Sequence, residues 1–432
     1  MEWLVALVLF GSFFTMLVLG VPISFSIAVA ALLSIMVSLP FDAALSVVSQ
    51  KLASGMDSFT LLAIPFFILA GNIMNRGGLA LRLIEFSKLL AGRLPGSLGH
   101  VNVIANMLFG SISGSAVAAA AAVGGTMAPL QKKGGYDPVF STAVNITSSP
   151  AGLLIPPSNA LIVYSLISGG TSISALFLGG YLPGLLMGAC VMLAVAVVAK
   201  KKNYPVSEPV TLAEAGVITW RAVPSLGLIV VIMGGIIGGV FTATEASAIA
   251  VIYSLLLALI YREVSLKDMP SIILGSIMTA SMIMLLIGAS MSMAWAMANA
   301  DIPYAVSDAL LALSDNPIVI LLIINLILLI VGIFMDMTPA LLIFTPIFLP
   351  IALDLGIDPV HFGIIITFNL CIGICTPPVG SALFVGCSVS GVKIDQVIKP
   401  LLPIFGLLLV ALLAVTFIPE ISLFLPSLLL GY

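Results

Sequence analysis

The segments SSPAGLLIPPSNA (148–160) and GICTPPVGS (373–381) share one pattern, a glycine followed by three residues and then two prolines. The doublets Pro156–Pro157 and Pro377–Pro378 lie 221 positions apart. The same offset relates further pairs around them: Pro129 and Pro350, Gly135 and Gly356, Asp137 and Asp358, Pro138 and Pro359, Val139 and Val360, Gly152 and Gly373, and Gly170 and Gly391. The chain therefore contains one segment twice. In a membrane chain, paired hydrophobic segments interrupted by glycine and proline point to the binding site of a transporter.

The composition predicts a membrane protein. Of 432 residues, 61% are hydrophobic and 8% are charged, which is too few charges to cover a water-facing surface of this size. The stretches 3–19, 228–260 and 401–418 reach or approach the roughly 20 apolar residues that a spanning helix needs. No basic run suggests nucleic acid, and no Gly-rich phosphate loop suggests ATP. Because the first residues carry Glu2 and no Lys or Arg, we expect the first helix to be retained in the mature protein.

The apolar segments predict ten membrane crossings. They lie near 2–20, 21–39, 58–75, 138–168, 173–199, 222–241, 243–261, 270–298, 360–391 and 400–425. Two helical hairpins are predicted near 97–131 and 317–353, each interrupted at mid-length by a tip that contains glycine. We interpret both hairpins as re-entrant, so that each enters and leaves on the same side. The segments 79–93 and 303–315 precede the hairpins and are expected to be surface helices.

Lysine and arginine collect on the cytoplasmic side of membrane proteins, so their positions predict the orientation. With both termini outside, Lys51 lies outside and the other basic residues lie in the cytoplasm: Arg76, Arg82, Lys88, Arg93, Lys132, Lys133, Lys200, Lys201, Lys202, Arg221, Arg262, Lys267, Lys393 and Lys399. On this map the hairpins open to opposite sides, so the repeats are inverted. The predicted fold class is an all-α polytopic membrane protein of inverted repeats, with two re-entrant hairpins and two broken helices. The predicted divisions are scaffold helices in 1–75 and 171–298, repeats in 76–170 and 299–391, and a C-terminal helix in 392–432.

Each proline doublet is expected to break its helix in mid-membrane. Proline lacks an N–H and clashes with the carbonyl one turn earlier, so a doublet leaves several backbone oxygens without partners. Hydrocarbon tolerates such groups only where protein, water or a ligand meets them, and Na⁺ is a natural ligand for carbonyl and hydroxyl oxygens. The tip at Gly110–Ser115 is expected against the first break, and the tip with Gly332 and Asp336 against the second. This arrangement predicts two pseudo-symmetric cation sites. The alternative, that these small residues only pack helices, is weakened by the repetition.

Polar residues at the tips and breaks are the candidates for substrate binding. They are Ser113, Ser115, Ser149, Asn159, Asp336, Thr338, Asn369 and Ser381. Asp336 is the one carboxylate placed near mid-membrane, where a bare charge costs at least about 3 kcal/mol, so it needs a cation, a proton or a donor partner. Asparagine amides and the half-helix N-termini at the breaks could donate to substrate carboxylates. Glu245, beside Thr242, is instead predicted to be an interfacial cap or an inter-helix contact.

The stretch from Gly110 to Ala122, together with 148–160 and 373–381, resembles the large membrane subunit of TRAP transporters, the tripartite ATP-independent periplasmic carriers. The resemblance extends over essentially the whole chain. It implies an elevator-type, Na⁺-driven importer of organic acids in a bacterial inner membrane. It also implies two partners, a small four-helix membrane subunit and a soluble periplasmic substrate-binding protein. Dicarboxylates such as succinate are the family's default substrates, followed by sialic acid, other sugar acids and keto acids.

Carried over by position, the resemblance implies two sodium sites made of backbone and hydroxyl oxygens. One uses Gly332, Gly373, Thr376 and Val379, and the other uses Ser111, Gly152, Ile155 and Ser158. Ile155 stands where the second copy has Thr376, so the first site lacks one hydroxyl and is expected to rely more on carbonyl oxygens. At least two Na⁺ ions are therefore expected in the transport cycle.

Three other interpretations remain open at the level of the sequence. A self-sufficient Na⁺/dicarboxylate symporter shares the hairpins and broken helices but needs no binding protein. The serines of the tip at 111–115 suggest an intramembrane serine protease, which would need a base beside the serine, and neither His100 nor His361 falls at a matching depth. A channel is the third. We expect a transport protein rather than an enzyme.

Overall fold

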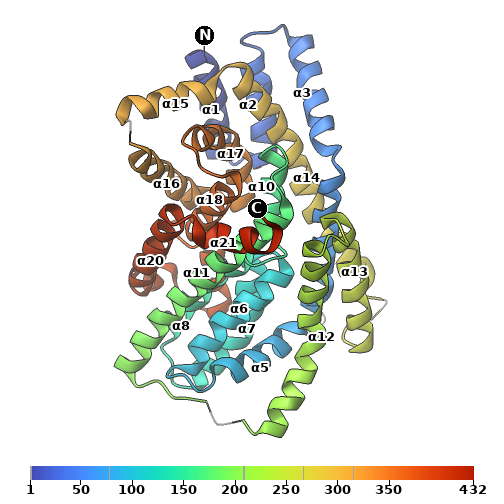
Figure 1. The fold of residues 1–432 in the computed structure, drawn as a ribbon, viewed down its shortest axis with the longest axis vertical. Helices are drawn as coiled ribbons and strands as arrows, with labels where there is room; N and C mark the ends of the chain where they lie inside the picture. The colour runs from blue at the N-terminus through green and yellow to red at the C-terminus, as the bar shows by residue number, and fades with distance from the viewer. Residues whose placement is uncertain (1, 77, 208–209, 266, 315) are drawn as a thin grey trace.

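The computed structural model describes residues 2–432 apart from 77, 208–209, 266 and 315, and the described residues form helices and no strand (Figure 1). The helices are α1 (Glu2–Val18), α2 (Ile23–Ile35), α3 (Phe41–Met56), the 3-10 turn η1 (Phe59–Leu62), α4 (Ala63–Arg76), α5 (Leu79–Ala91), α6 (Ser97–Ser113), α7 (Ala116–Lys133), α8 (Pro138–Ser148), α9 (Ala151–Leu154), α10 (Asn159–Ile167), α11 (Ile173–Lys202), α12 (Leu212–Ile237), α13 (Ala243–Ile260), α14 (Met269–Asn299), α15 (Ile302–Leu313), α16 (Pro317–Phe334), α17 (Met337–Asp354), α18 (Pro359–Gly373), α19 (Ser381–Ser390), α20 (Ile394–Phe417) and α21 (Glu420–Leu430). The all-helical fold class is confirmed.

An aspartate followed by a proline starts the broken helix of each repeat. Asp137 accepts a hydrogen bond from the amide of Val139 at 2.9 Å, and its counterpart Asp358 accepts one from the amide of Val360 at 2.8 Å. The proline between them sits at the first helical position, where the missing N–H has no partner within the helix. The carboxylate satisfies one of the free amides of the first turn. The two repeats therefore begin their broken helices in the same way.

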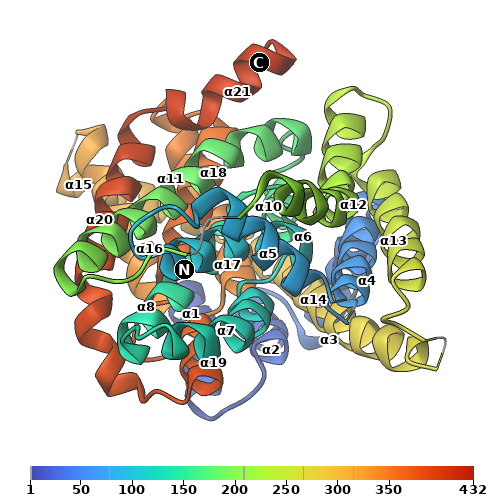
Figure 2. The same cartoon turned by 90° about the horizontal axis from the view of Figure 1, so that it is seen from below.

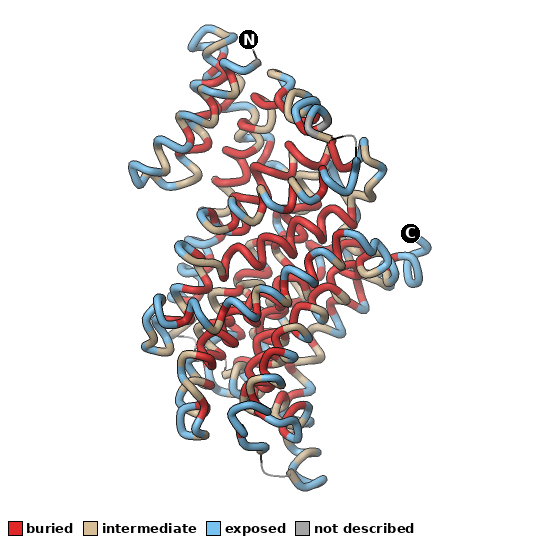
Figure 3. Tube along the Cα trace, turned by 90° about the vertical axis from the view of Figure 1, so that its left-hand side faces the viewer, coloured by how far each residue is buried: buried red, intermediate tan, exposed pale blue. Residues whose placement is uncertain are grey.

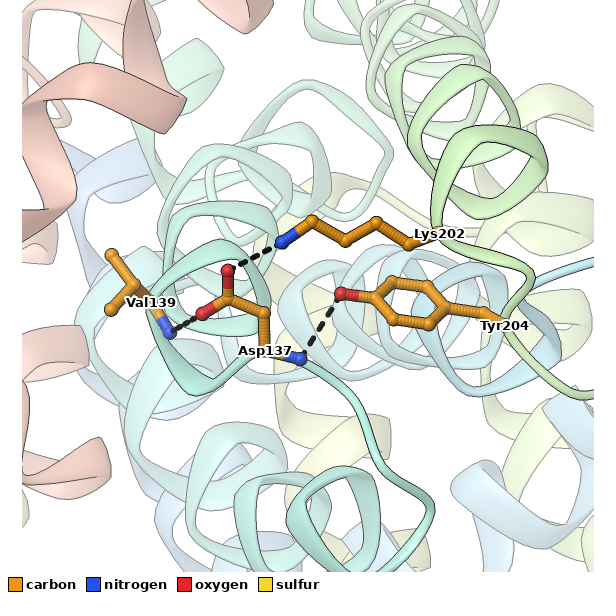
Figure 4. A network of polar contacts seen from close by, with 4 residues as sticks. All are labelled: Asp137, Val139, Lys202 and Tyr204. Carbon is orange, nitrogen blue, oxygen red and sulfur yellow. Dashed lines mark hydrogen bonds and ion pairs between the residues drawn. The ribbon is translucent and has the colours of Figure 1, made fainter.

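The start of α8 is also tied to the end of α11 (Figure 4). The ammonium of Lys202 donates to the Asp137 carboxylate at 2.6 Å. The amide of Asp137 donates to the hydroxyl of Tyr204 at 3.0 Å, and the Tyr204 ring stacks on Tyr136 with 4.2 Å between ring centroids. These contacts fix one end of the first broken helix to the chain that follows it.

Both predicted hairpins are present as helix pairs. In the first, α6 and α7 are joined at Gly114, which adopts a left-handed conformation with φ of 62°. In the second, α16 and α17 are joined at Met335 and Asp336. Figure 1 shows the pair α6–α7 in the lower half of the molecule and the pair α16–α17 in the upper half. Their opposite placement agrees with inverted repeats, whereas their re-entrance into a membrane stays a prediction.

The helices break at both proline doublets, as predicted. In the first repeat, Pro138–Leu154 and Asn159–Ile167 are bent by 50°. In the second, α18 ends at Gly373 and α19 begins at Ser381. The peptide bonds Pro156–Pro157 and Pro377–Pro378 are both cis. Each break therefore leaves a short non-helical segment between two half-helices.

The two repeats cross over each other. Helix α10 of the first repeat packs on α17 and α18 of the second, and α19 of the second repeat packs on α7 and α8 of the first. Figure 2 shows α19 beside α7. The Sγ atom of Cys371 lies 3.6 Å from the carbonyl oxygen of Pro150, which is its counterpart 221 positions earlier. A residue that touches its own counterpart lies on the pseudo-two-fold axis, so this contact marks the axis.

The helices form two packing groups. The outer block, α1–α4 with α12–α14, is held by contacts of α13 with α4 and of α14 with α2, α3 and α4. The repeat core consists of α6–α11 and α16–α21. It contains α18, in which every residue from Val360 to Gly373 is buried. Figure 3 shows that buried residues are concentrated in the central helices. Helix α11 packs on α9 and α18. The stretch 171–298, predicted as scaffold throughout, thus divides between the two groups, while the domain boundaries themselves stay a prediction.

Length and hydropathy support a multi-pass membrane protein. Within the described residues, 8 helices are long and apolar enough to cross a bilayer, or up to 9 when the bent pair at the first break counts as one span. This set includes α16 and α17, whereas α1 has 17 residues and α2 has 13. A helix of 13 residues is about 20 Å long, shorter than the roughly 30 Å of a hydrocarbon core. By length and hydropathy the described helices therefore give 8 or 9 candidate crossings, in place of the ten that were predicted.

Two predicted boundaries are wrong. Residues 40–57 carry no predicted helix, yet α3 forms there and packs on α14, where Gly288 faces the backbone of Leu52 and Ser292 donates to the carbonyl of Val48 at 3.2 Å. The polar residues of α3 lower its hydropathy below that of a membrane span. Its buried face could therefore not be predicted without knowing which helix packs on it. The predicted span 400–425 is two helices, because α20 ends at Phe417 and α21 begins beyond Pro419.

Candidate functional site

Each hairpin meets the broken helix of its own repeat through two glycines. A β-carbon placed on Gly152 would lie 2.4 Å from the Cα atom of Gly110, and one on Gly373 would lie 2.6 Å from the Cα atom of Gly332. Real side-chain atoms cannot approach backbone atoms so closely, so both crossings require the absence of a side chain. Both predicted contacts between tip and break are therefore present, with equivalent residues in the two repeats.

A cavity of about 300 Å³ lies where the two tips and the two breaks meet. Six of the eight predicted substrate residues line it: Ser113, Ser115, Asn159, Asp336, Thr338 and Ser381. They come from segments that are up to 268 positions apart in the chain, counted from Ser113 to Ser381. The cavity is thus a product of the crossed repeats.

The N-termini of four helices converge on this cavity. The first residues of α7, α10, α17 and α19 all line it: Ala116, Asn159, Met337 and Ser381. The first amides of a helix lack partners within the helix, and each N-terminus carries about half a positive charge. Four such ends create a positive environment around a cavity whose described lining residues include no lysine or arginine. This environment suits an anionic group.

Asp336 supplies negative charge at the same place. It is the N-cap residue of α17 but makes no side-chain cap bond to its own helix. Instead its Oδ1 atom accepts a hydrogen bond from the hydroxyl of Ser381 at 3.1 Å. The bond joins the second tip to the second break. The cavity therefore combines four positive helix ends with one carboxylate, a combination that can hold an anion together with a cation.

The candidate sodium ligands lie at the breaks and tips as predicted, and their hydroxyls face nearby carbonyls. Thr376 donates to the carbonyl of Ile372 at 2.8 Å, and Ser111 donates to that of Leu108 at 2.9 Å. Ser158 donates to the carbonyl of Leu153 across the first break. Each hydroxyl oxygen keeps lone pairs that can accept a cation. Oxygen-only sets of this kind suit a hard cation rather than a transition metal.

The two breaks differ in their surroundings. Pro156, Pro157 and Ser158 are buried, whereas Pro378 is exposed and Val379 is 45% exposed. The oxygens of the first break are therefore enclosed by protein, and those of the second are closer to the molecular surface.

Two predicted substrate residues lie away from the cavity. Ser149 is fully buried and donates to the carbonyl of Ile146 at 3.0 Å. Asn369 is also fully buried, and its amide donates to Asn325 at the carbonyl (2.9 Å) and the side-chain oxygen (2.8 Å). Asn325 in turn donates to the hydroxyl of Thr416 at 3.1 Å. The Nδ2 group of Asn369 thus ties α18 to α16, whereas its Oδ1 atom is buried without a hydrogen-bond partner among the described residues.

Other lining residues escaped prediction because they belong to the outer block. Helix α4 contributes Gly71, Asn72 and Asn75, and α14 contributes Thr279. The two asparagines, three positions apart near the end of an apolar segment, are the signal that could have pointed to this wall. Their position against the tips depends on how the outer block packs on the repeat core.

Glu245, His100 and His361 do not line the cavity. Glu245 forms a capping box with Thr242, whose amide donates to its carboxylate at 2.8 Å, so its prediction as a cap is confirmed. The Nδ1 atom of His361 lies 2.6 Å from the hydroxyl of Ser422, and His100 is buried in α6. Among the described residues that line the cavity there is no histidine. The described part of the chain thus places no histidine beside the tip serines.

A helical membrane protein with crossed repeats, two broken helices and a polar cavity at their meeting point has the architecture of a secondary transporter. The family of tripartite ATP-independent periplasmic transporters, DctM component, matches residues 10–421. The chain belongs to this family as its large membrane subunit. It is therefore a multi-pass membrane protein of a transport system and not an enzyme.

Curated relatives agree with this assignment, and one solved structure shares the fold. The protein YgiK of Salmonella typhimurium is 61% identical over 98% of this chain and 97% of that protein. The C4-dicarboxylate TRAP transporter large permease DctM of Pseudomonas aeruginosa is 41% identical over 87% and 88%. The sialic acid TRAP transporter large permease SiaM of Vibrio cholerae is 37% identical over 96% of each. The YdaH transporter of Alcanivorax borkumensis shares the fold, with a TM-score of 0.64 at 12% identity over 88% of this chain and 90% of that one.

Proposed function

We propose that the chain is the permease of a Na⁺-coupled importer that moves an organic acid from the periplasm to the cytoplasm of a bacterium. The observation that carries the proposal is the convergence of four helix N-termini on one cavity of about 300 Å³. A volume at the lower end of the range of ligand pockets suits a small molecule. The surrounding positive helix ends favour carboxylate groups. Acids of the C4-dicarboxylate or sialic acid class fit this description.

Sodium coupling is supported by the carbonyl and hydroxyl oxygens at both breaks, which can serve as ligands of a cation. The first candidate site consists of Ser111, Gly152, Ile155 and Ser158, and the second consists of Gly332, Gly373, Thr376 and Val379. Because a tenfold concentration ratio is worth about 1.4 kcal/mol, two Na⁺ ions moving down a tenfold gradient supply about 2.7 kcal/mol. This energy supports about a hundredfold accumulation of a dianion without net charge movement. Each further Na⁺ would add about 2.3 kcal/mol per 100 mV of membrane potential.

The two packing groups support an elevator movement, in which the repeat core slides against the outer block. Helix α5 joins α4 to α6, packs on both α6 and α12, and is held to the outer block by an ion pair of Arg82 with Glu263 at 2.6 Å. Helix α15 joins α14 to α16 and packs on α17. Each of these helices connects one group to the other. In this proposal α11 and α20 move with the repeats, because they pack on the broken helices.

The orientation with both termini in the periplasm follows from the distribution of basic residues. The tripartite family works with a small membrane subunit and a periplasmic binding protein, and we propose the same two partners here. The binding protein would deliver the acid to the periplasmic side of the cavity. Inward transport would then follow the sodium gradient.

The test is uptake into proteoliposomes that contain this chain, the small membrane subunit and the binding protein. We expect uptake of a radiolabelled acid, with succinate and sialic acid as probes, that requires both an inward sodium gradient and the binding protein. Equal uptake without sodium would contradict the coupling. Full uptake without the binding protein would favour a self-sufficient symporter, for which the same cavity and breaks would serve. Non-saturable flux would indicate a channel.

A further inference from the structure

The cavity has two walls that belong to different packing groups. The tips and breaks of the repeat core form one wall. The other wall comes from α4 and α14 of the outer block, with Asn72, Asn75 and Thr279 as its polar residues. A substrate in this cavity therefore faces the outer block as well as the repeat core.

The polar residues of the outer wall have different tasks. Asn72 is half-buried, and its amide donates to the hydroxyl of Ser276 at 2.8 Å, which joins α4 to α14. Asn75 lies one turn further along α4 and is exposed at the cavity wall. An asparagine amide offers two N–H donors without a charge. Asn75 can therefore bind a carboxylate without holding it as strongly as an arginine would.

The height of this contact along α4 depends on the position of the repeat core. A β-carbon on Gly71 would lie 3.0 Å from the carbonyl oxygen of Ser113, so the first tip rests directly on α4 at this level. Asn75 is four residues further, about 6 Å along the helix axis, and α4 ends at Arg76. If the repeat core moved toward the other end of α4 by more than this distance, the tip and its cavity would leave Asn75 behind.

Resting on the organic-acid transport proposed above, we propose that Asn75 is a substrate ligand in one conformation only, the one in which the cavity lies at the Arg76 end of α4. In the proposed orientation this end is cytoplasmic. Asn75 then holds a substrate carboxylate before its release to the cytoplasm and loses it when the core returns. The outer block thereby sets the affinity for the substrate on the cytoplasmic side, while the residues that the repeat core contributes to the cavity stay the same.

The experiment compares the substrate concentration for half-maximal transport from the two sides, in inside-out and right-side-out vesicles that contain the full system. The variants are Asn75→Ala and Asn75→Asp, with succinate and sialic acid as probes. Removing a hydrogen bond to a charged group predicts a rise of about tenfold on the cytoplasmic side, and the aspartate should raise it further through repulsion. The periplasmic value should stay unchanged. Ser281→Ala is the matched control, because Ser281 lies on α14 in a different, apolar groove.

A second measurement does not depend on turnover. In Asn75→Cys, a saturating concentration of the transported acid should slow maleimide labelling, whereas labelling of Ser281→Cys should be unaffected. Two results would overturn the inference while wild-type uptake remains. One is an equal change, on both sides of the membrane, in the substrate concentration for half-maximal transport by the Asn75 variants. The other is unchanged concentrations on both sides together with labelling of Asn75→Cys that the acid does not slow. Wild-type vesicles that take up neither acid would overturn the proposed function and this inference with it.

Discussion

Gly332 on α16 and Gly373 at the end of α18 lie backbone against backbone, so that a β-carbon on Gly373 would be 2.6 Å from the Cα atom of Gly332. Gly110 and Gly152 repeat this relationship in the other half of the chain. In both repeats the close approach sets the hairpin tip beside the helix break. The crossing of the repeats, through α10 on α17 and α19 on α7, then brings the tips and breaks of both repeats to one cavity.

Gly373→Ala is expected to separate the second tip from the second break. The added methyl group meets main-chain atoms, which cannot turn aside as a flexible side chain can. Overpacking of this kind typically costs about 1–3 kcal/mol, and we expect lower thermal stability in detergent together with strongly reduced uptake. The matched control is Gly406→Ala in α20, where nothing lies within 4 Å of the added carbon. Equal behaviour of the two variants would show that the glycine crossing is not required.

Thr376→Val is expected to weaken sodium activation. Valine keeps the shape of threonine but removes the hydroxyl oxygen that lies at the second break and donates to Ile372 at 2.8 Å. We expect the sodium concentration for half-maximal uptake to rise by roughly tenfold, the loss typical when one group around a bound metal is removed. Thr219→Val on α12 is the control, because that hydroxyl makes the same kind of bond, to Ala215 at 2.8 Å, and does not line the cavity. An unchanged sodium dependence would remove Thr376 from the site.

Asp336→Asn is expected to impair sodium-coupled uptake while keeping the contact with Ser381. The amide oxygen can still accept the hydrogen bond that the carboxylate accepts at 3.1 Å, but the negative charge beside the four helix ends is lost. We expect at least about a tenfold fall in uptake, the scale of a lost interaction with a charged group. Asp336→Glu, which restores the charge, should recover part of it. Recovery of uptake by the glutamate but not by the asparagine is the result that identifies the charge as the cause.

The lowered pKa of Asp137 predicts that the folded protein loses stability in acid. Burial alone would raise the pKa of Asp137, but the hydrogen bonds from Lys202 and from the amide of Val139 outweigh burial and hold the pKa below its ordinary value. A carboxylate with a lowered pKa stabilises the folded state fully above its unfolded pKa of about 3.9, and this contribution is lost as the pH falls through the folded pKa. Because both partners are partly exposed, the pair is worth at most about 1 kcal/mol.

This pH dependence can be measured by thermal unfolding of the detergent-solubilised protein between about pH 7 and pH 3. Asp137→Asn keeps a side chain that can cap α8 but cannot form the ion pair. The variant should be slightly less stable than the wild type near neutral pH and equally stable in acid, so that the two curves converge. Asp42→Asn, on the exposed first turn of α3, is the control. Curves that stay parallel for Asp137→Asn would contradict the role of the pair.

Much of the site could be predicted because its signals are local. Single prolines such as Pro183 and Pro346 lie inside α11 and α17, whereas the doublets Pro156–Pro157 and Pro377–Pro378 coincide with the two helix breaks. The recurrence of residues such as Asp137 and Asp358 predicts equivalent capped helices. Six candidate substrate residues line one cavity because they flank these local interruptions.

Other features could not be predicted because they depend on contacts between distant segments. Ser149 and Asn369 resemble the lining residues in sequence, but the neighbouring helices bury them, and the Nδ2 group of Asn369 donates to Asn325. Helix α3 contains too many polar residues to resemble a span, and its buried face is formed by its packing on α14 and α2. Asn75 reaches the cavity only because the outer block packs on the first tip at Gly71.

Backbone chemistry and apolar length are properties of short segments, and from them alone the chain specifies a helical membrane protein with two broken, repeated elements. The crossing of the repeats, the position of their axis at Pro150 and Cys371, and the second wall of the cavity arise only on folding. The physical reason is that a glycine permits two backbones to approach closely but does not determine how the two repeats pack on each other. The crossing is set by contacts between helices of different repeats, such as the contact of Cys371 with Pro150, which lie 221 positions apart in the chain.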